Sequence, residues 1–305
     1  MKEFEGKQDE LAIQLRRART EGGAFILPPR LVVRLSGRDA FRYLNGQVTR
    51  DLGRLSKNEA LPACILTPKG KLCAPLLIRY AGDDLLVEAD PILEGSLLAR
   101  LERYIVSDDV TLSIESPGEG ETVHVFGMIA SDEKWKEQGG ILVSRMGVPG
   151  WDVGKTLMDT NQSLKLLDLQ VVEALRIERG IPSWGSELSE ETLPPEVGLD
   201  RTHIDYDRGC YPGQETISRL RSIGRVRRLL HTLHSLPGSP LYAGMHIIDE
   251  EKKEIGTIIS AAEQFDTGAG VALAILPREK SDTLFARLPL TDATTPLSIM
   301  EIYGS

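Results

Sequence analysis

The residues best suited to chemistry lie in the run GCYPGQE, residues 209–215, which follows Arg208. Pro212 is typical of the first turn of a helix, and Glu215 suits the positive end of a helix dipole. We therefore expect Cys210 just before a helix and two residues after a cation, and both neighbours favour thiolate over thiol. The alternative is a small buried side chain that packs a tight Gly-Cys turn.

An arginine tract follows this run. It places five guanidinium groups within ten residues, and such a cluster favours an anionic ligand such as a carboxylate. RNA phosphate is a competing ligand, and an exposed surface without a ligand is the third possibility. The tract consists of Arg219, Arg221, Arg225, Arg227 and Arg228.

The elements that position these residues form a mixed pattern. Residues 9–21 and 168–179 have the apolar spacing of helices, and the second begins with a good N-cap, Asp168. Residues 31–37 alternate like a strand. Beyond about residue 226, short strands separated by turn residues predict a small β-barrel. The pattern indicates the α+β class with a leading helical segment, 1–24, and a carboxy-terminal domain, 226–305.

The composition disfavours several classes of partner and location. The chain of 305 residues has 41% hydrophobic residues and a formal net charge of −9, so it is expected to be globular and to repel nucleic acid overall. The charged amino terminus contains no apolar stretch suited to a signal peptide or a membrane span. A cytoplasmic location without membrane attachment is the expectation, and the interior of an organelle fits equally well.

The sequence offers no clear metal site. Cys64, Cys73 and Cys210 are an odd number without a CxxC pair, which disfavours a disulfide framework, a zinc site and a four-thiolate iron–sulfur cluster within one chain. His231 and His234 are three residues apart in a strand-like run, so they are expected on opposite faces. We predict no metal held by this chain alone.

Residues 173–219 resemble the YgfZ/GcvT-like folate-binding family, which is related to the glycine cleavage T-protein. GCYPGQE is close to the family signature GC(F/Y)xGQE, and RIERGIPSWGSEL, residues 176–188, is similar to the T-protein segment that contacts folate. A looser similarity extends from about residue 30 to about 276. Arg208 replaces the usual lysine of the motif. The motif positions are Arg208, Gly209, Cys210, Tyr211, Gly213, Gln214 and Glu215.

The resemblance implies a fold and a ligand. It predicts a GcvT-like three-part architecture in which residues 25–225 form the folate-binding region, as two interleaved α+β subdomains, ahead of the β-barrel. The ligand would be tetrahydrofolate or a derivative. In the resembling T-proteins a glutamate at the position of Glu187 accepts the ring N–H and the amino group of the pterin. Trp184 would offer a flat wall, and the carboxylates of the folate tail would pair with Arg219, Arg225 and Arg227.

One departure from the family concerns catalysis. Aminomethyltransferases that resemble this chain have a GGIIDD-like strand, which places a carboxylate close to the reactive folate nitrogens. The matching stretch here is GKLCAP, residues 70–75, so Ala74 and Pro75 occupy the acidic positions. Neither side chain can transfer a proton, so the original reaction is not expected.

The leading hypothesis is therefore a tetrahydrofolate-binding accessory protein. The resembling family supports the synthesis or repair of iron–sulfur clusters in client enzymes, with the motif cysteine implicated, so iron–sulfur client or assembly proteins are the implied partners. An active folate-dependent aminomethyl or one-carbon transferase that uses a different acid is one alternative. An RNA-modification-related binding module is the other, although the net charge makes nucleic acid an unlikely partner.

Overall fold

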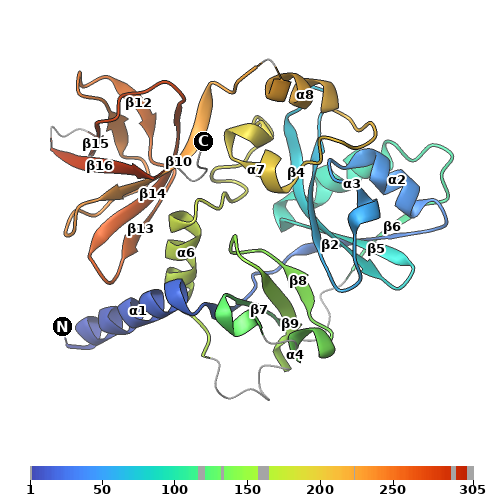
Figure 1. Ribbon diagram of the computed structural model, residues 1–305, viewed down its shortest axis with the longest axis horizontal. Coiled ribbons are helices and arrows are strands. Elements are labelled where there is room, and N and C mark those ends of the chain that lie inside the picture. Colours follow the sequence, from blue (N-terminus) through green and yellow to red (C-terminus); the bar gives the residue numbers. More distant parts are fainter. Residues whose placement is uncertain are drawn as a thin grey trace.

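The computed structural model describes residues 2–115, 121–131, 134–156, 165–222, 224–289 and 293–300. Three antiparallel sheets, with helices between and around them, make up the fold (Figure 1). Among the described residues, no helix is long and apolar enough to cross a membrane.

The first sheet has five strands in the order β3-β4-β5-β2-β6. Its core combines Val33 and Ile78 from the strands with Leu44 of α2 and Leu97 and Leu101 of α3, so the two helices cover one face. The elements are β2 (Leu31–Ser36), α2 (Ala40–Gln47), the 3-10 turn η1 (Leu52–Arg54), β3 (Leu61–Leu66), β4 (Leu72–Ala81), β5 (Asp84–Ala89), the 3-10 turn η2 (Pro91–Leu93), α3 (Glu94–Glu102) and β6 (Thr111–Ile114).

The second sheet has four strands in the order β1-β7-β9-β8. Trp135 of α4 is fully buried against Val123 and Val125 of β7, which anchors that short helix to the sheet. The elements are β1 (Gly23–Ile26), β7 (Thr122–Phe126), η3 (Met128–Ser131), α4 (Lys134–Glu137), β8 (Ile141–Val143) and β9 (Gly150–Gly154).

A half-buried charge cluster joins the first sheet to the second. The Arg145 guanidinium, which follows β8, pairs with Glu88 of β5 at 2.7 Å and with Asp152 of β9 at 2.6 Å. His124 of β7 contacts the same Asp152 carboxylate through Nδ1 at 2.8 Å. Each carboxylate therefore has cationic or N–H partners that offset the cost of its burial.

The carboxy-terminal sheet has seven strands in the order β12-β11-β15-β16-β10-β14-β13. Its end strand β12 also packs against β14, so the sheet curls around its own apolar core. The strands are β10 (Arg228–Ser235), β11 (His246–Ile248), β12 (Glu254–Thr257), β13 (Ser260–Gln264), β14 (Ala269–Pro277), β15 (Leu284–Arg287) and β16 (Thr294–Met300).

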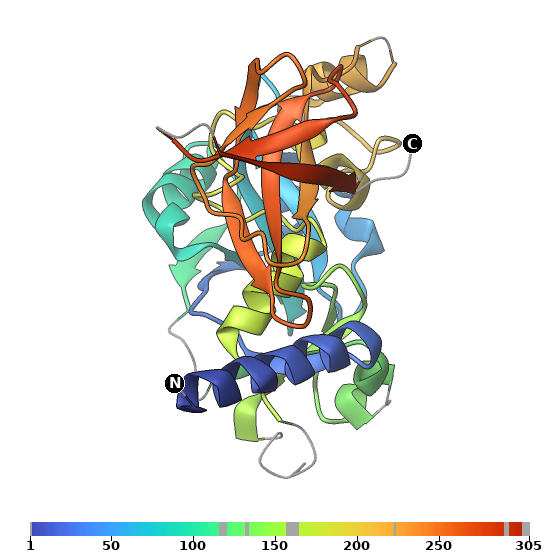
Figure 2. The same cartoon turned by 90° about the vertical axis from the view of Figure 1, so that its left-hand side faces the viewer.

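Helices connect the three sheets. The amino-terminal helix α1 crosses α6, and α6 in turn packs on β13 and β14 (Figures 1 and 2). Arg19 of α1 binds Glu178 at 2.8 Å and Asp266 of the β13–β14 turn at 2.6 Å, which ties α1 and α6 to the carboxy-terminal sheet. The helices are α1 (Lys2–Thr20), α6 (Leu169–Glu178), η4 (Pro194–Glu196), α7 (Leu199–Thr202) and α8 (Gln214–Ser222).

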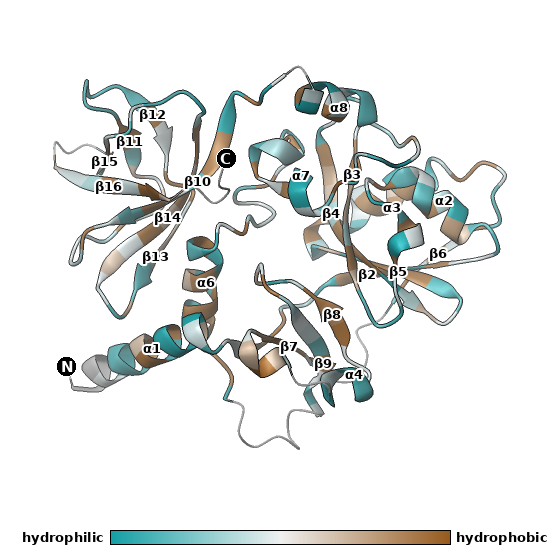
Figure 3. Ribbon diagram, viewed as in Figure 1, coloured by the Kyte–Doolittle hydropathy of each residue, from teal (hydrophilic) through white to brown (hydrophobic). Residues whose placement is uncertain are grey.

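The hydropathy pattern explains this arrangement. Apolar residues concentrate on the strands, while α1 and α8 carry polar outer faces (Figure 3). Burial alternates along the first part of β4, as a half-buried strand requires. The predicted α+β class is confirmed, and the predicted small barrel takes the form of a curled sheet. The division at residues 24 and 225 stays a prediction, and one core cluster, which holds both Ile217 and Leu230, spans the second boundary.

Candidate functional site

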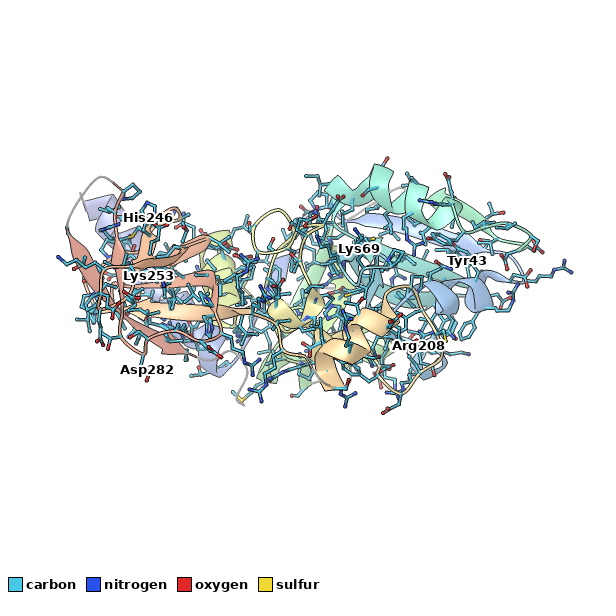
Figure 4. All side chains as sticks on the ribbon, turned by 90° about the horizontal axis from the view of Figure 1, so that it is seen from above. Tyr43, Lys69, Arg208, His246, Lys253 and Asp282 are labelled. Carbon is cyan, nitrogen blue, oxygen red and sulfur yellow. The ribbon has the colours of Figure 1, made fainter. Side chains whose placement is uncertain are left out.

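The GCYPGQE loop places its cysteine at the surface and its tyrosine in the core. Cys210 is exposed, and α8 begins four residues later at Gln214. Tyr211 is buried, and burial raises the pKa of its hydroxyl to about 12. The buried ring anchors the loop and leaves the neighbouring thiol accessible to a partner. Figure 4 shows the loop residue Arg208 beside α8, far from His246 and Asp282 at the opposite end of the molecule.

The Arg208 guanidinium fixes this loop to the last turn of α2 and the chain that follows it. Nη1 donates to the Val48 carbonyl at 2.9 Å and to the Arg50 carbonyl, and Nη2 donates to the Asn45 carbonyl at 2.5 Å. Burial lowers the pKa of Arg208, and the charge of nearby Asp51 opposes this only in part. A planar fork with several N–H groups reaches three carbonyls at once, which a lysine ammonium matches less well.

Asp205, which the sequence analysis did not single out, is the second anchor of the loop. Its buried carboxylate accepts the Asp51 N–H at 2.9 Å and pairs with Arg50 at 3.0 Å and Arg54 at 3.1 Å. The only feature of the sequence that could have indicated Asp205 as an anchor is its position three residues before Arg208. Asp207, one residue before Arg208, could have been chosen equally well. Only the fold distinguishes the two, because Asp205 is buried and Asp207 is exposed.

Two glycines bring the motif against the β3–β4 turn. Gly213 has a φ of 87°, and a Cβ added there would lie 2.5 Å from the Thr67 carbonyl oxygen. Gly70 has a φ of 77°, and its added Cβ would lie 2.9 Å from Cβ of Thr216. Both positions need glycine for conformation and for space. The β3–β4 turn and the start of α8, which are far apart in the sequence, are thereby held in direct contact.

Glu187 is a buried carboxylate with one occupied and one unoccupied oxygen. Oε2 accepts the Ser183 N–H at 3.0 Å and pairs with Arg176 Nη1 at 3.2 Å. Oε1 is buried and accepts no hydrogen bond from the described part of the chain. A buried acceptor without a donor is costly, so a ligand with an N–H group would satisfy a real deficit.

Trp184 lies on the tight loop that also carries Glu187. The loop closes through hydrogen bonds from the Gly185 N–H to the Leu188 carbonyl and from the Leu188 N–H to the Ser183 carbonyl, both 3.0 Å long. The half-buried Trp184 ring packs between the core of the first sheet and the core next to it. This position is consistent both with a wall of a ligand site and with a packing role.

The positions that lack the family acid lie on β4. Ala74 is buried in the core of the first sheet, and Pro75 pairs with Cys64 of β3. Their neighbour Cys73 is half-buried, and burial raises the pKa of its thiol, while Arg100 lowers it and Glu190 raises it. A thiol, a guanidinium and an exposed carboxylate therefore occupy this area, and the sequence analysis singled out none of the three for the site.

The arginine tract is divided by the fold. Arg219, Arg221, Arg225, Arg227 and Arg228 are all exposed. Arg221 and Arg225 line a cavity of about 430 Å³ between α7, α8 and β10, whereas Arg219, Arg227 and Arg228 lie outside its lining. Glu187 and Cys210 are not among the lining residues either. The structure therefore separates the predicted residues into a buried carboxylate, an exposed thiol and an arginine surface.

Two further observations complete the site. Glu215 is exposed on α8, Gly209 is exposed, and Gln214 donates to the Arg208 carbonyl at 3.4 Å, which joins the motif to its own anchor. No group of three or more histidine, cysteine, aspartate or glutamate side chains suited to a metal ion occurs among the described residues.

Comparison with known proteins identifies relatives over most of the chain. The tRNA-modifying protein YgfZ of Aliivibrio fischeri (strain MJ11) is 26% identical over 281 residues, covering 83% of this chain and 85% of that protein. The protein of the same name from Yersinia pseudotuberculosis (serotype O:1b) is 26% identical over 261 residues, covering 77% and 78%. No family model matches.

A solved structure shows the same fold. The crystal structure of glycine cleavage system aminomethyltransferase T from Bartonella henselae superimposes with a TM-score of 0.78 at 16% identity, covering 95% of this chain and 88% of that one. At this identity the likeness concerns the fold alone. Together with the sequence relatives it confirms the resemblance to the YgfZ/GcvT-like family that the GCYPGQE segment predicted.

Proposed function

We propose that this YgfZ-like chain, which has the fold of an aminomethyltransferase, binds tetrahydrofolate and supports iron–sulfur enzymes through Cys210 without transferring an aminomethyl group. The observation that carries the folate part is the Glu187 carboxylate. Two protein donors fix Oε2, and Oε1 lacks a donor within the described residues. An N–H group of a pterin, either the ring N–H or the adjacent amino group, would supply the donor that Oε1 lacks.

The surroundings of Glu187 support the proposal. Arg176 is held in place by Glu173 at 2.7 Å and by its own bond to the Ile181 carbonyl at 2.6 Å, so the carboxylate is oriented before a ligand arrives. Trp184, on the same loop, would stack on the pterin. Because Oε1 is buried, the chain around Glu187 has to move before a pterin can reach it.

The side chains of β4 at the positions of the family acid support an accessory role and not catalysis. Ala74 and Pro75 supply no acid, and the Cys73 thiol, whose pKa is raised by burial, is a poor replacement for a carboxylate. The exposed Cys210, fixed between the Arg208 and Tyr211 anchors, is instead accessible to a protein partner. We assign the folate tail to the exposed Arg219 and Arg227. Arg225, the third arginine expected there, lines the separate cavity.

Calorimetric titration with tetrahydrofolate tests the folate proposal. Glu187→Gln should weaken binding by about 1.5–3 kcal/mol, the usual contribution of a hydrogen bond to a charged group. Glu190→Gln is the matched control, because Glu190 is an exposed carboxylate of the same loop region. An unchanged affinity in Glu187→Gln together with a loss in Glu190→Gln would move the pterin to Glu190. No binding by the unaltered protein would reject the proposal.

The names of the sequence relatives favour one second function, contact with tRNA. The exposed Arg219, Arg227 and Arg228 would contact phosphates, and such binding weakens steeply with salt. Saturable tRNA binding that weakens in Arg219→Gln and Arg227→Gln would support this function. Binding that is equally weak in all variants and at every salt concentration would exclude it.

A further inference from the structure

The cavity between α7, α8 and β10 combines an excess of cations with a buried histidine. Five cationic side chains line it against the two carboxylates of Glu196 and Asp200, a local excess of three positive charges in a protein whose net charge is −9. The cationic lining consists of Arg201, Arg221, Arg225, Arg278 and Lys280. Such a local excess is maintained against self-repulsion and favours an anionic ligand.

Three of these cations have no ion-pair partner among the described residues. Arg225, Arg278 and Lys280 form no ion pair with the described residues, although carboxylates are common elsewhere on the surface. Arg221 stacks on the Tyr206 ring, with its Cζ 4.0 Å from the ring centroid. Stacking fixes the plane of the guanidinium and leaves its N–H edge available to an anion.

His231 provides an independent indication of a ligand. It is only 4% exposed, it lines the cavity, and neither ring nitrogen has a hydrogen-bond partner in the described part of the chain. Burial, followed by the charge of Lys280, lowers its pKa to about 4, so the ring is neutral at physiological pH. A neutral imidazole keeps one N–H donor, which here has no acceptor among the described residues.

We propose that this cavity binds a small phosphate-bearing molecule, with His231 donating an N–H to one phosphate oxygen. The cations around the phosphate would be Arg221, Arg225, Arg278 and Lys280. The volume of about 430 Å³ suits a small ligand and excludes a nucleic-acid duplex. A phosphate group concentrates charge and acceptors in one small volume, which matches cations that surround a single hollow. The site is distinct from the folate site, because Glu187, Arg219 and Arg227 do not line it.

Titration of the full chain with inorganic pyrophosphate at physiological ionic strength tests the proposal without folate. Saturable binding is expected, and Arg278→Gln should weaken it about tenfold. Arg228→Gln is the matched control, since Arg228 is an exposed arginine of the same tract outside the lining, and its affinity should change less than about twofold. Thermal melting of each variant shows that the fold is retained.

A second readout concerns the histidine alone. Pyrophosphate should shift the imidazole NMR signals of His231 and raise its pKa, because the anion favours the protonated ring. The charged and titratable groups that line the cavity together with this ring are Glu196, Asp200, Arg201, Tyr206, Arg221, Arg225, Arg278 and Lys280. His231→Gln should bind pyrophosphate several-fold more weakly and lose the signal.

Other outcomes overturn the inference. Equal losses in Arg278→Gln and Arg228→Gln would show diffuse attraction to the arginine surface. Binding of tri-γ-glutamate in place of pyrophosphate would make the cavity part of the folate site. Competition between pyrophosphate and tetrahydrofolate would lead to the same conclusion. The folate proposal is tested separately, because Glu187→Gln should leave pyrophosphate binding unchanged.

Discussion

Glu187 and Cys210 are placed in opposite environments, one buried and oriented, the other exposed. Ligand binding and thiol chemistry should therefore be separable by single substitutions. Cys210→Ala removes the sulfur and leaves the Tyr211 and Arg208 anchors, so thermal stability and tetrahydrofolate affinity should stay near wild type. The variant should nevertheless fail to complement a strain defective in iron–sulfur enzyme activity.

The Cys210 prediction has two contrary outcomes. Full complementation by Cys210→Ala would remove the functional role of the thiol. A large loss of stability would show that the sulfur packs the turn. Labelling rates with iodoacetamide, measured against pH in a protein that lacks Cys64 and Cys73, report the reactivity of Cys210 directly.

The lowered pKa values of His203 and His231 predict that the protein loses stability in acid. Burial, followed by a nearby cation, lowers the pKa of both His203 and His231 to about 4, below the ordinary 6.5. The unfolded chain therefore binds these protons first, so stability is full above about pH 6.5 and falls as the pH drops toward 4. Chemical denaturation from about pH 7 to pH 5 should show a smaller decrease for His231→Gln than for the unaltered protein.

The sequence indicated the site residues that belong to a local motif, and it missed those whose environment depends on contacts between distant parts of the chain. GCYPGQE indicated the Cys210 loop because glycine permits turn conformations and proline fixes φ at the start of a helix. Asp205, Arg100 and His231 have no comparable local pattern, and their environments depend on partners far along the chain. Glu187 was easier to place, because its contacts with Ser183 and Arg176 are close in sequence.

The contact between the β3–β4 turn and the start of α8 depends on backbone freedom at Gly213. Gly213→Ala adds a Cβ that meets the Thr67 carbonyl and sets a side chain at a φ of 87°. The free energy of unfolding should fall by at least about 2 kcal/mol, measured by chemical denaturation. Gly209→Ala is the control from the same motif, because nothing lies within 4 Å of its added Cβ. Equal effects of the two changes would contradict this reasoning.

Element prediction succeeded where the pattern is local. The helical spacing at residues 168–179 corresponds to α6, and the Asp168 side chain caps its first turn by accepting the Gln170 N–H at 2.9 Å. The curl of the carboxy-terminal sheet was less accessible, because it depends on which distant strands pair. β10, for example, lies between β14 and β16. Alternation along one strand carries no information on its neighbours.

At the scale of the whole molecule, Arg145 links the first two sheets. Arg145→Met leaves the half-buried Asp152 carboxylate without its cation and leaves Glu88 with Arg30 alone, so the free energy of unfolding should fall by about 3 kcal/mol. Arg17→Met, which removes an exposed pair with Glu21, should cost less than about 1 kcal/mol. Chemical denaturation compares the two, and similar values would show that the link contributes little.

This chain has the fold of an aminomethyltransferase, but we do not expect it to catalyse the same reaction. We expect no ammonia-releasing aminomethyl transfer in a reconstituted glycine-cleavage assay, because Ala74 and Pro75 replace the acidic pair. Ala74→Asp should not restore turnover, since Ala74 is buried in the apolar core of the first sheet, where a carboxylate is costly and poorly positioned for proton transfer. Robust turnover by the unaltered protein would support the transferase alternative.

The Arg19 contacts also have a consequence for protein synthesis. Arg19 is translated early, but its partner Asp266 follows 247 residues later. On the ribosome, α1 therefore emerges long before the carboxy-terminal turn that holds it, and Leu11 and Leu15, buried in the finished protein, have no complete core to enter. The amino-terminal helix should therefore stay sensitive to proteases until the β13–β14 turn has been made and Asp266 can bind Arg19.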